Sequence, residues 1–237
     1  MSPYGALWIG SGLTDMPRLA IVAALEREVR PLIKTWRMSE KEHQGRIFRF
    51  FENGDVVLVC GGIGAAAARR AAEAVIAIFD PKIVCSAGFA GALDGALRVG
   101  DIIRPHTVIN AGDASKVIIA GGEGVLVSFE AVASPAQKSK LHESFDAQAV
   151  DMEAAAVARS AEARGKEFTA AKAISDESDF EFPALKRFVD PDGRFSELRF
   201  AGYTAIRPWL WARVIRLGRN SNRASRALCM SLRTLSA

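Results

Sequence analysis

Three acidic residues stand where a folded chain could use them for chemistry. Glu28 comes shortly after the apolar run from Leu19 to Leu25. Glu153 opens an alanine-rich stretch, and Asp176 follows Ser175 at the end of another apolar run. Carboxyl groups donate and accept protons, and they accept hydrogen bonds from hydroxyl groups. The three together indicate acid and base chemistry.

Each of these residues also has a purely structural interpretation, which the sequence leaves open. Ser175 and Asp176 could cap the next turn, as Ser and Asp often do. Glu153 could satisfy only the dipole of a helix start. Glu26 and Glu28 could be two solvated charges on an amphipathic helix.

Neither a metal site nor a dinucleotide site is expected. The three histidines, His43, His106 and His142, are scattered and lack metal-ligand spacing. The glycine motif that starts at Gly62 follows a strand and opens a helix, as a dinucleotide fingerprint does. Such a site needs an acid at the end of the next strand, and Asp80 comes before that strand. The glycines are expected instead to permit close packing of helix on sheet.

The elements that must position these residues alternate between strands and helices. Strands are expected at Leu19–Leu25, Arg46–Phe51, Val56–Cys60, Lys82–Ala87, Asp101–Val108, Lys116–Ala120, Val125–Ser128 and Phe168–Ile174. Helices are expected between Gly64 and Asp80, near Ser134–Glu143 and near Met152–Arg164. This order predicts an α/β fold, with a mixed central β-sheet flanked by helices.

Composition favours one soluble domain. The 237 residues contain no Pro/Gly/Ser-rich linker, and 49% of them are hydrophobic. We expect a loose extension at residues 1–18 and the main domain at residues 19–200. The apolar stretches are far shorter than the roughly 20 residues that cross a bilayer. The start lacks a signal-peptide pattern and the three cysteines are widely separated, which favours the cytoplasm.

The end of the chain is strongly basic. Residues 198–237 contain eight arginines and no acidic residue, so the net charge of +4 leaves −4 for residues 1–197. We expect residues 201–237 to form a basic amphipathic helical tail of the same domain, with Trp209 and Trp211 among the arginines. The tail could lie on an anionic membrane, or it could pack on the core or on a partner subunit. Nucleic-acid binding is not expected, because no recognised binding module accompanies the charge.

Six segments, in this order, carry a resemblance to a known family. They are Ile21–Val29, Gly61–Gly64, Ser86–Gly91, Leu97–Ile102, Val150–Ala156 and Ala173–Asp176. They resemble the purine nucleoside phosphorylases and nucleosidases, and within these the methylthioadenosine/S-adenosylhomocysteine nucleosidases. The resemblance implies a nucleoside phosphorylase-like three-layer sandwich. It also implies an enzyme that cleaves the N-glycosidic bond of an adenine nucleoside by hydrolysis, without a cofactor or a metal.

The resemblance also implies roles for the acidic residues. Asp176, oriented by Ser175, would protonate N7 of the purine, for which burial or a like charge must raise its pKa from about 3.9. Glu153 would bind the ribose 2′- and 3′-hydroxyls, with Met152 against the sugar. Glu28 would polarise the attacking water.

The remaining expected substrate contacts are Gly88, Phe89, Ala131 and Val132. Phe89 stands where nucleosidases commonly have Ser, so it removes a hydroxyl near the sugar and adds apolar bulk. Lys172 replaces an arginine usually found four residues before the catalytic aspartate, and Asp151 replaces a glutamate. The segment between Asp101 and Asp151 is shorter than in those enzymes, which leaves the 5′-substituent open.

Several alternatives stay open at this point. Arg27 and Arg30 leave phosphate possible as a co-substrate, which would make the protein a phosphorylase. A nucleoside-binding protein that has lost turnover is a further alternative. The basic tail, the short middle and the segment Asp190–Gly193 are similar to the hopanoid-associated branch, whose members are thought to remove adenine from adenosylhopane. Methylthioadenosine, S-adenosylhomocysteine and adenosylhopane are therefore all candidate substrates, and a homodimer is expected.

Overall fold

A single mixed sheet organises the residues that the computed structural model describes, namely 18–180, 185–188, 190, 193 and 195–235. The strands are β1 (Leu19–Ala23), β2 (Arg37–His43), β3 (Arg46–Asn53), β4 (Val56–Cys60), β5 (Ile83–Ala92), β6 (Ile102–Ile103), β7 (Thr107–Asn110), β8 (Lys116–Ile118), β9 (Val125–Ser128), β10 (Ala149–Asp151) and β11 (Glu167–Asp176). The helices are α1 (Glu26–Ile33), α2 (Ala65–Phe79), α3 (Pro135–Phe145), α4 (Ala154–Glu162), α5 (Glu197–Ala205) and α6 (Trp211–Leu235), with 3-10 turns η1 (Leu185–Phe188) and η2 (Pro208–Leu210).

The sheet has the order β2-β3-β4-β1-β5-β10-β9-β7-β8, and β11 pairs with both β5 and β6. The central strands β4, β1, β5 and β11 run parallel, whereas β2 and β3 form an antiparallel edge. This arrangement confirms the α/β class with a mixed sheet. Because parallel strands end at one edge of a sheet, the residues that follow β1 and close β5 and β11 meet there.

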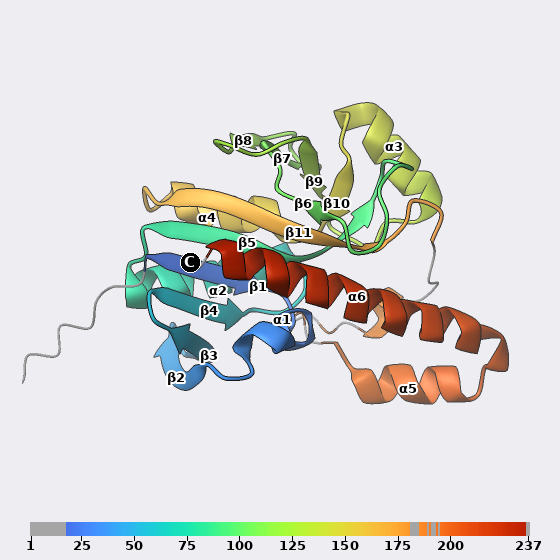
Figure 1. Ribbon diagram of the computed structural model, residues 1–237, viewed down its shortest axis with the longest axis horizontal. Helices are drawn as coiled ribbons and strands as arrows, with labels where there is room; N and C mark the ends of the chain where they lie inside the picture. The colour runs from blue at the N-terminus through green and yellow to red at the C-terminus, as the bar shows by residue number, and fades with distance from the viewer. Residues whose placement is uncertain (1–17, 181–184, 189, 191–192, 194, 236–237) are drawn as a thin grey trace, which may run out of the picture.

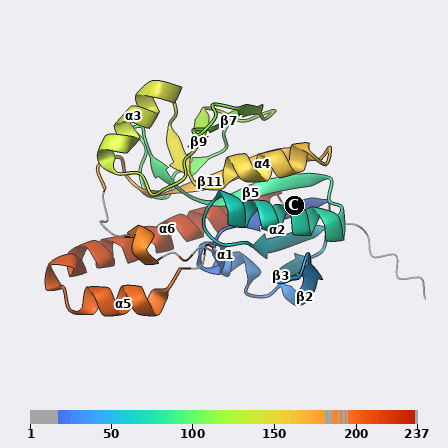
Figure 2. The same ribbon diagram turned by 180° about the vertical axis from the view of Figure 1, so that it is seen from behind.

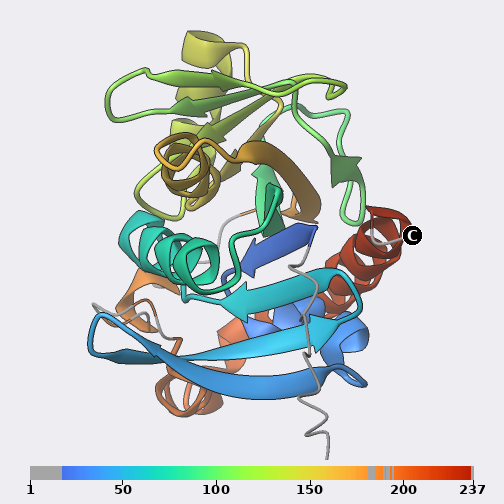
Figure 3. The same cartoon turned by 90° about the vertical axis from the view of Figure 1, so that its left-hand side faces the viewer.

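The two faces of the sheet are covered by different helices. Ile21 of β1 packs in a core cluster with α1 and α6, whereas Val22 packs in a second cluster with α2 and α4. Figure 1 shows α6 crossing one face, and Figure 2 shows α2 and α4 on the other. Figure 3 looks along the layers, with the sheet between α2 and α6. Alternating side chains of one buried strand thus fill both cores.

The prediction of a single strand at Asp101–Val108 is wrong. The chain instead forms two short strands, β6 and β7, and they pair with different neighbours. Between them lies Pro105, which has no N–H to donate to a ladder. The expectation also missed β2, whose sequence RMSEKEH is a charged, exposed edge strand without apolar alternation.

The basic tail divides into two parts. The second half of α6 is packed structure, because Ala224, Leu228 and Leu232 lie in the core cluster with α1 and β11. Its first half runs beside α5 and extends beyond the sheet (Figure 1). The helix α5 crosses residue 200, where the sequence placed the start of the tail. The expected extension lies outside the described residues up to residue 17.

Candidate functional site

The carboxyl ends of the central strands bring most of the expected residues to one edge of the sheet. In the parallel pairing of β11 with β5, Lys172 lies opposite Gly88 and Asp176 lies opposite Gly91. At a rise of about 3.3 Å per residue, the two positions on β5 are roughly 10 Å apart along the strand. A nucleoside can bridge that distance, with its sugar at one end and its base at the other.

Glu28 lies in the first turn of α1 with its carboxylate buried beside β5. A Cβ atom placed on Gly88 would lie 3.0 Å from Glu28 Oε2 and 3.7 Å from Lys172 Nζ. Within the described residues, Oε2 has no hydrogen-bond partner. Burial and the nearby Glu153 raise the pKa of Glu28 to about 7. Glu28 is therefore not the solvated helix charge that the sequence allowed; that description fits Glu26, which pairs with Arg49 at the surface.

Glu153 turns its carboxylate away from its own helix. Its Oε1 accepts a 2.7 Å hydrogen bond from the Gly64 N–H at the start of α2. Its Oε2 accepts one from the Met152 N–H at 3.3 Å. Burial and the neighbouring Asp151 raise the pKa of Glu153 to about 7, against the opposing effect of Lys172. A group that served only the dipole of α4 would not need this long reach to residue 64.

Asp151 caps α4 in place of Glu153. Its Oδ2 accepts a hydrogen bond from the Ala154 N–H and the Lys172 ammonium, both at 2.8 Å. Its Oδ1 accepts a bond from the Ser128 hydroxyl at 2.5 Å. Burial alone would lower the pKa of Lys172, but Asp151 and Glu153 outweigh it and raise that pKa. The cluster of Glu28, Asp151 and Glu153 around Lys172 is hereafter called the carboxylate cluster.

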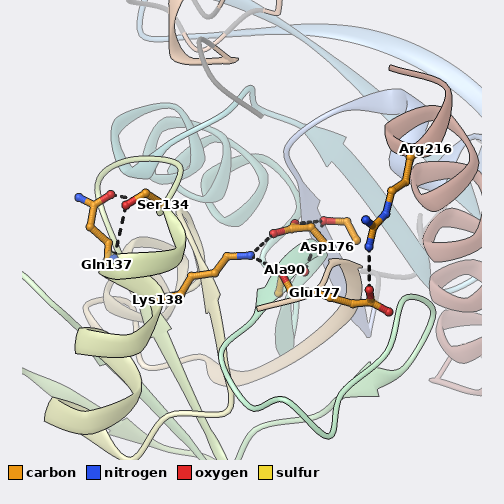
Figure 4. A network of polar contacts seen from close by, with 8 residues as sticks. Ala90, Ser134, Gln137, Lys138, Asp176, Glu177 and Arg216 are labelled. Carbon is orange, nitrogen blue, oxygen red and sulfur yellow. Dashed lines mark hydrogen bonds and ion pairs between the residues drawn. The ribbon is translucent and has the colours of Figure 1, made fainter. Parts of the chain in front are cut away.

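Asp176 lies at the end of β11 and meets a residue that the sequence did not single out. Its Oδ1 accepts a hydrogen bond from Ser175 Oγ at 2.8 Å. Its Oδ2 forms an ion pair with Lys138 Nζ at 2.5 Å (Figure 4). From the sequence, burial or a like charge was expected at Asp176. The structure shows neither, since the side chain is 25% exposed and its partner is a cation.

The structure brings the remaining expected substrate contacts only partly together. A cleft of about 350 Å³ at the starts of α2 and α4 is lined by residues that include Phe129, Glu130 and Met152. Ala131 is half-buried next to this lining, and Val132 is 48% exposed. Phe89 packs against the core cluster of α1 and α6, on the other face of β5 from its neighbour Gly88. Contact of these residues with substrate stays a prediction.

The sequence did not identify two contributors to the site, and there is a physical reason for each. Lys138 looks like an ordinary solvated charge in a short polar helix, and only the packing of α3 buries it. The Gly64 N–H belongs to the glycine motif, whose side-chain pattern says nothing of a backbone donor. The expected role in packing does not hold for Gly64, where a Cβ atom would meet nothing within 4 Å; the close approach is at Gly61, just before the motif, where a Cβ atom would lie 2.6 Å from Ala71 Cβ.

The geometry of Glu153 leads to a prediction for Glu153→Gln. We expect KM to rise and kcat to fall, with a combined loss of about 10- to 100-fold in kcat/KM. Hydrogen bonds to a charged group contribute roughly 1.5–3 kcal/mol, and those to ribose act in both binding and the transition state. Steady-state kinetics with a ribonucleoside and its 2′- and 3′-deoxy analogues would measure it. If the variant loses the same factor on the deoxy analogues, Glu153 does not bind those hydroxyls.

Comparisons with known proteins identify the relatives of this chain. Residues 18–136 and 116–190 match the family model described as "Phosphorylase superfamily". A 5′-methylthioadenosine/S-adenosylhomocysteine nucleosidase of Staphylococcus carnosus is 26% identical over 197 residues, covering 67% of this chain and 86% of that protein. An aminodeoxyfutalosine nucleosidase of Campylobacter jejuni is 25% identical over 179 residues, covering 60% and 78%. The crystal structure of a 5′-methylthioadenosine/S-adenosylhomocysteine nucleosidase from Colwellia psychrerythraea, in complex with adenine, superposes with a TM-score of 0.61 at 23% identity, covering 68% and 84%.

Proposed function

The chain belongs to the phosphorylase superfamily, and from this premise we propose that it hydrolyses the N-glycosidic bond of an adenine nucleoside at the edge of the sheet where β5 and β11 end. The main observation behind the proposal is that these strands present two chemically different groups, one at each end of the site. The carboxylate cluster lies at Gly88, and Asp176 lies at Gly91. The first suits a sugar and a water molecule, and the second suits a leaving base.

In this proposal each acidic residue has a separate role in the reaction. Breaking the bond between ribose and adenine leaves positive charge on the sugar and negative charge on the purine. Asp176, oriented by Ser175, delivers a proton to N7, and Glu153 accepts hydrogen bonds from the ribose hydroxyls. Glu28 takes a proton from the water that attacks C1′; its Oε2, which has no hydrogen-bond partner in the described part of the chain, is the acceptor for that water. Glu28 must be ionised for this, so the rate should fall as the pH drops below about 7, the pKa of Glu28.

Electrostatics favour water over phosphate as the nucleophile. The carboxylate cluster has three acidic groups and one ammonium, which is bonded to Asp151. A phosphate dianion placed there would meet like charges, and like charges are costly in a buried site. Of the two arginines that left phosphorolysis open, Arg27 stacks over the Phe195 ring at 4.8 Å, and Arg30 is exposed. Hydrolysis is therefore proposed, with no cofactor needed.

The experiment for this function is a substrate panel. Adenine release would be measured from adenosine, methylthioadenosine, S-adenosylhomocysteine and adenosylhopane, each with and without phosphate. The proposal expects release from at least one of them at a rate independent of phosphate. A rate that requires phosphate would make the protein a phosphorylase, and binding without release would make it a nucleoside-binding protein.

The surroundings of the site bear on the 5′-substituent. Phe180 follows Asp176 by four residues, is buried, and lies under the Arg216 guanidinium at 5.2 Å. Phe188, Phe195 and Phe200 form a further aromatic group between η1 and α5. An apolar 5′-group is proposed on this ground. Of the segment Asp190–Gly193, residues 191–192 lie outside the described part of the chain.

The proposed partners of the protein are a small-molecule nucleoside and a second copy of the chain, in the cytoplasm. Within the described residues, no helix is both long enough and apolar enough to cross a membrane. Association with the inner face of the membrane is kept as part of the proposal, now restricted to α5, η2 and the first half of α6, residues 197–219. This segment is called the basic hairpin.

The basic hairpin leaves large apolar side chains uncovered beside its arginines. Trp209 is 72% exposed and Ile215 is 55% exposed. A basic helix that carries such residues suits an anionic membrane interface. Deletion from Trp209 onward, the obvious test from the sequence, is unsuitable because it removes Leu228 and Leu232 from the core. Substitution of surface side chains is needed instead.

We predict that Trp209→Ser with Ile215→Ser weakens binding to anionic vesicles by about tenfold or more, since each buried apolar side chain contributes roughly 1.5–3 kcal/mol. Binding of the wild-type protein should also weaken with salt. Vesicle sedimentation would measure both, with Met230→Ser as the matched control, since Met230 is equally exposed on the packed half of α6. Equal binding by all forms contradicts membrane association, and a changed oligomeric state of the double variant assigns the surface to a subunit interface.

A further inference from the structure

Lys138 of α3 is a buried cation that reaches the base end of the site. Its side chain is only 2% exposed. Its Nζ donates hydrogen bonds to Asp176 Oδ2 at 2.5 Å and to the Glu177 carbonyl oxygen at 2.7 Å (Figure 4). An ammonium group removed from water costs much free energy unless it is paired and hydrogen-bonded. The Lys138 ammonium is thus charged and shielded from water. Among the described residues, only Asp176 balances its charge.

The start of α3 is built to hold this lysine in place. Ser134 and Gln137 form a reciprocal capping box, in which each side chain accepts a hydrogen bond from the other's backbone N–H. The Lys138 N–H then donates to the Ser134 carbonyl at 2.8 Å. These hydrogen bonds hold the first turn of α3 in place, and the Lys138 side chain extends from that turn, as Figure 4 shows.

The neighbouring strand also makes room for the pair. A Cβ atom on Gly91 of β5 would lie 2.9 Å from Asp176 Oδ2 and 3.3 Å from Lys138 Cε. The first distance is shorter than any ordinary contact of a Cβ atom, so a side chain at this position would displace the carboxylate. Glycine at position 91 is thus a requirement of the ion pair.

The ion pair changes where the proton of the reaction resides. Both oxygens of Asp176 act as acceptors, one from Ser175 and one from Lys138. In an ammonium–carboxylate pair the proton is on the nitrogen. An acid that must supply N7 of a leaving purine therefore has its proton one hydrogen bond away, on Nζ of Lys138.

We propose that Lys138 is the proton store of the leaving-group acid, and that it acts through Asp176 as a positioning residue. The proposal rests on the proposed hydrolysis of an adenine nucleoside. As the C1′–N9 bond breaks, its electron pair moves to the purine. The Nζ–H bond of Lys138 breaks as an O–H bond of Asp176 forms, and this O–H bond breaks as N7–H forms. Water attacks C1′ and gives its proton to Glu28; after the products leave, Glu28 releases this proton to solvent and Lys138 takes one up from solvent.

Burial makes the transfer physically reasonable. A neutral amine is tolerated in a dry site, so Lys138 can stay buried after it gives up its proton. The fixed start of α3 keeps the amine in place for the next cycle.

The test compares two leaving groups in the full-length protein. Adenine release from the best substrate of the panel needs a proton, whereas p-nitrophenolate leaves p-nitrophenyl riboside without one. We expect Lys138→Met to lower kcat for adenine release at pH 8 by about 100-fold or more, as for loss of a general acid. We expect hydrolysis of the nitrophenyl riboside to change less than twofold. For Lys138→Met, kcat for adenine release should also fall about tenfold per pH unit over the alkaline range in which kcat of the wild type is flat.

Lys138→Arg separates charge from proton supply, because a guanidinium keeps its charge and does not release its proton. We expect it to bind adenine like wild type and to stay defective in adenine release. Full activity of Lys138→Arg would show that charge alone suffices and would overturn the proton store. Equal losses of Lys138→Met on both leaving groups, or no loss on either, would overturn it too. A wild-type protein that releases no adenine from any substrate would overturn the proposed function and this inference together.

Discussion

Asp176→Asn is expected to stop release of the base while leaving nucleoside binding nearly intact. The amide keeps the shape of the carboxyl group; its oxygen can accept from Lys138 and its NH2 can donate to the Ser175 oxygen, but it cannot pass a proton to the purine. General acid catalysis is typically worth roughly 10²–10⁴-fold, and kcat should fall by that range. Single-turnover kinetics would measure the chemical step, and calorimetry with a non-cleavable nucleoside analogue would measure binding.

A matched control is available in the same turn of the chain. Asp179 is exposed, so Asp179→Asn changes the same charge by the same chemistry without touching the ion pair. It should keep wild-type kinetics. Loss of analogue binding in Asp176→Asn with unchanged turnover of the bound substrate would contradict the assignment, as would a loss shared by both variants.

Glu28→Gln is expected to abolish turnover of a hydrolase, with a loss of at least about 100-fold, because glutamine cannot take the proton of the attacking water. Its control is Glu26→Gln, which removes an exposed carboxylate from the same turn of α1. Initial rates of adenine release with both variants would measure the difference. Wild-type rates for Glu28→Gln would exclude Glu28 as the base.

The same substitution should stabilise the fold at alkaline pH. The pKa of Glu28 is raised from its usual 4.5 to about 7 by burial, so the folded state binds this proton more tightly than the unfolded chain does. Stability of the wild type therefore falls as the pH rises from about 4.5 to about 7. Glutamine carries no charge there, and at pH 8 Glu28→Gln should be more stable by about 3 kcal/mol, since one pKa unit corresponds to 1.36 kcal/mol.

Urea unfolding at pH 5 and at pH 8 would show this, because the gain should be present at pH 8 and much smaller at pH 5. Glu26→Gln should show no such pH dependence. A Glu28→Gln protein that is less stable than wild type at pH 8 would mean that the carboxylate stabilises the fold. The expectation is the opposite, namely that the ionised carboxylate lowers the stability of the fold and is present for catalysis.

The sequence could predict the acids but not all of their surroundings. Local order places Glu28 after a strand, and the motifs at Glu153 and Asp176 resemble a family signature. These are short-range patterns, and the structure puts all three residues at the edge where the parallel strands end. Lys138 is separated from Asp176 by 38 residues and reaches it only through the packing of α3, which no local pattern reports.

The tail shows the same limit in another way. Arginines at helical spacing are visible in the sequence, whereas the burial of Leu228 and Leu232 depends on packing against α1 and β11, which exists only in the folded chain. Pro105 is different, because the sequence does contain a signal against the single predicted strand. A proline between two apolar stretches favours two strands over one. The charged strand β2 carries no apolar period, so pattern alone could not find it.

In the proposed reaction, water, and not phosphate, attacks an adenine nucleoside at the carboxylate cluster. The most direct test is the mass of the sugar product after complete conversion of the best substrate in phosphate buffer, with adenine quantified in the same sample. We predict one equivalent of adenine and one of the free sugar, with the same rate when phosphate is removed. Accumulation of the sugar 1-phosphate, at a rate that depends on phosphate, would contradict the account.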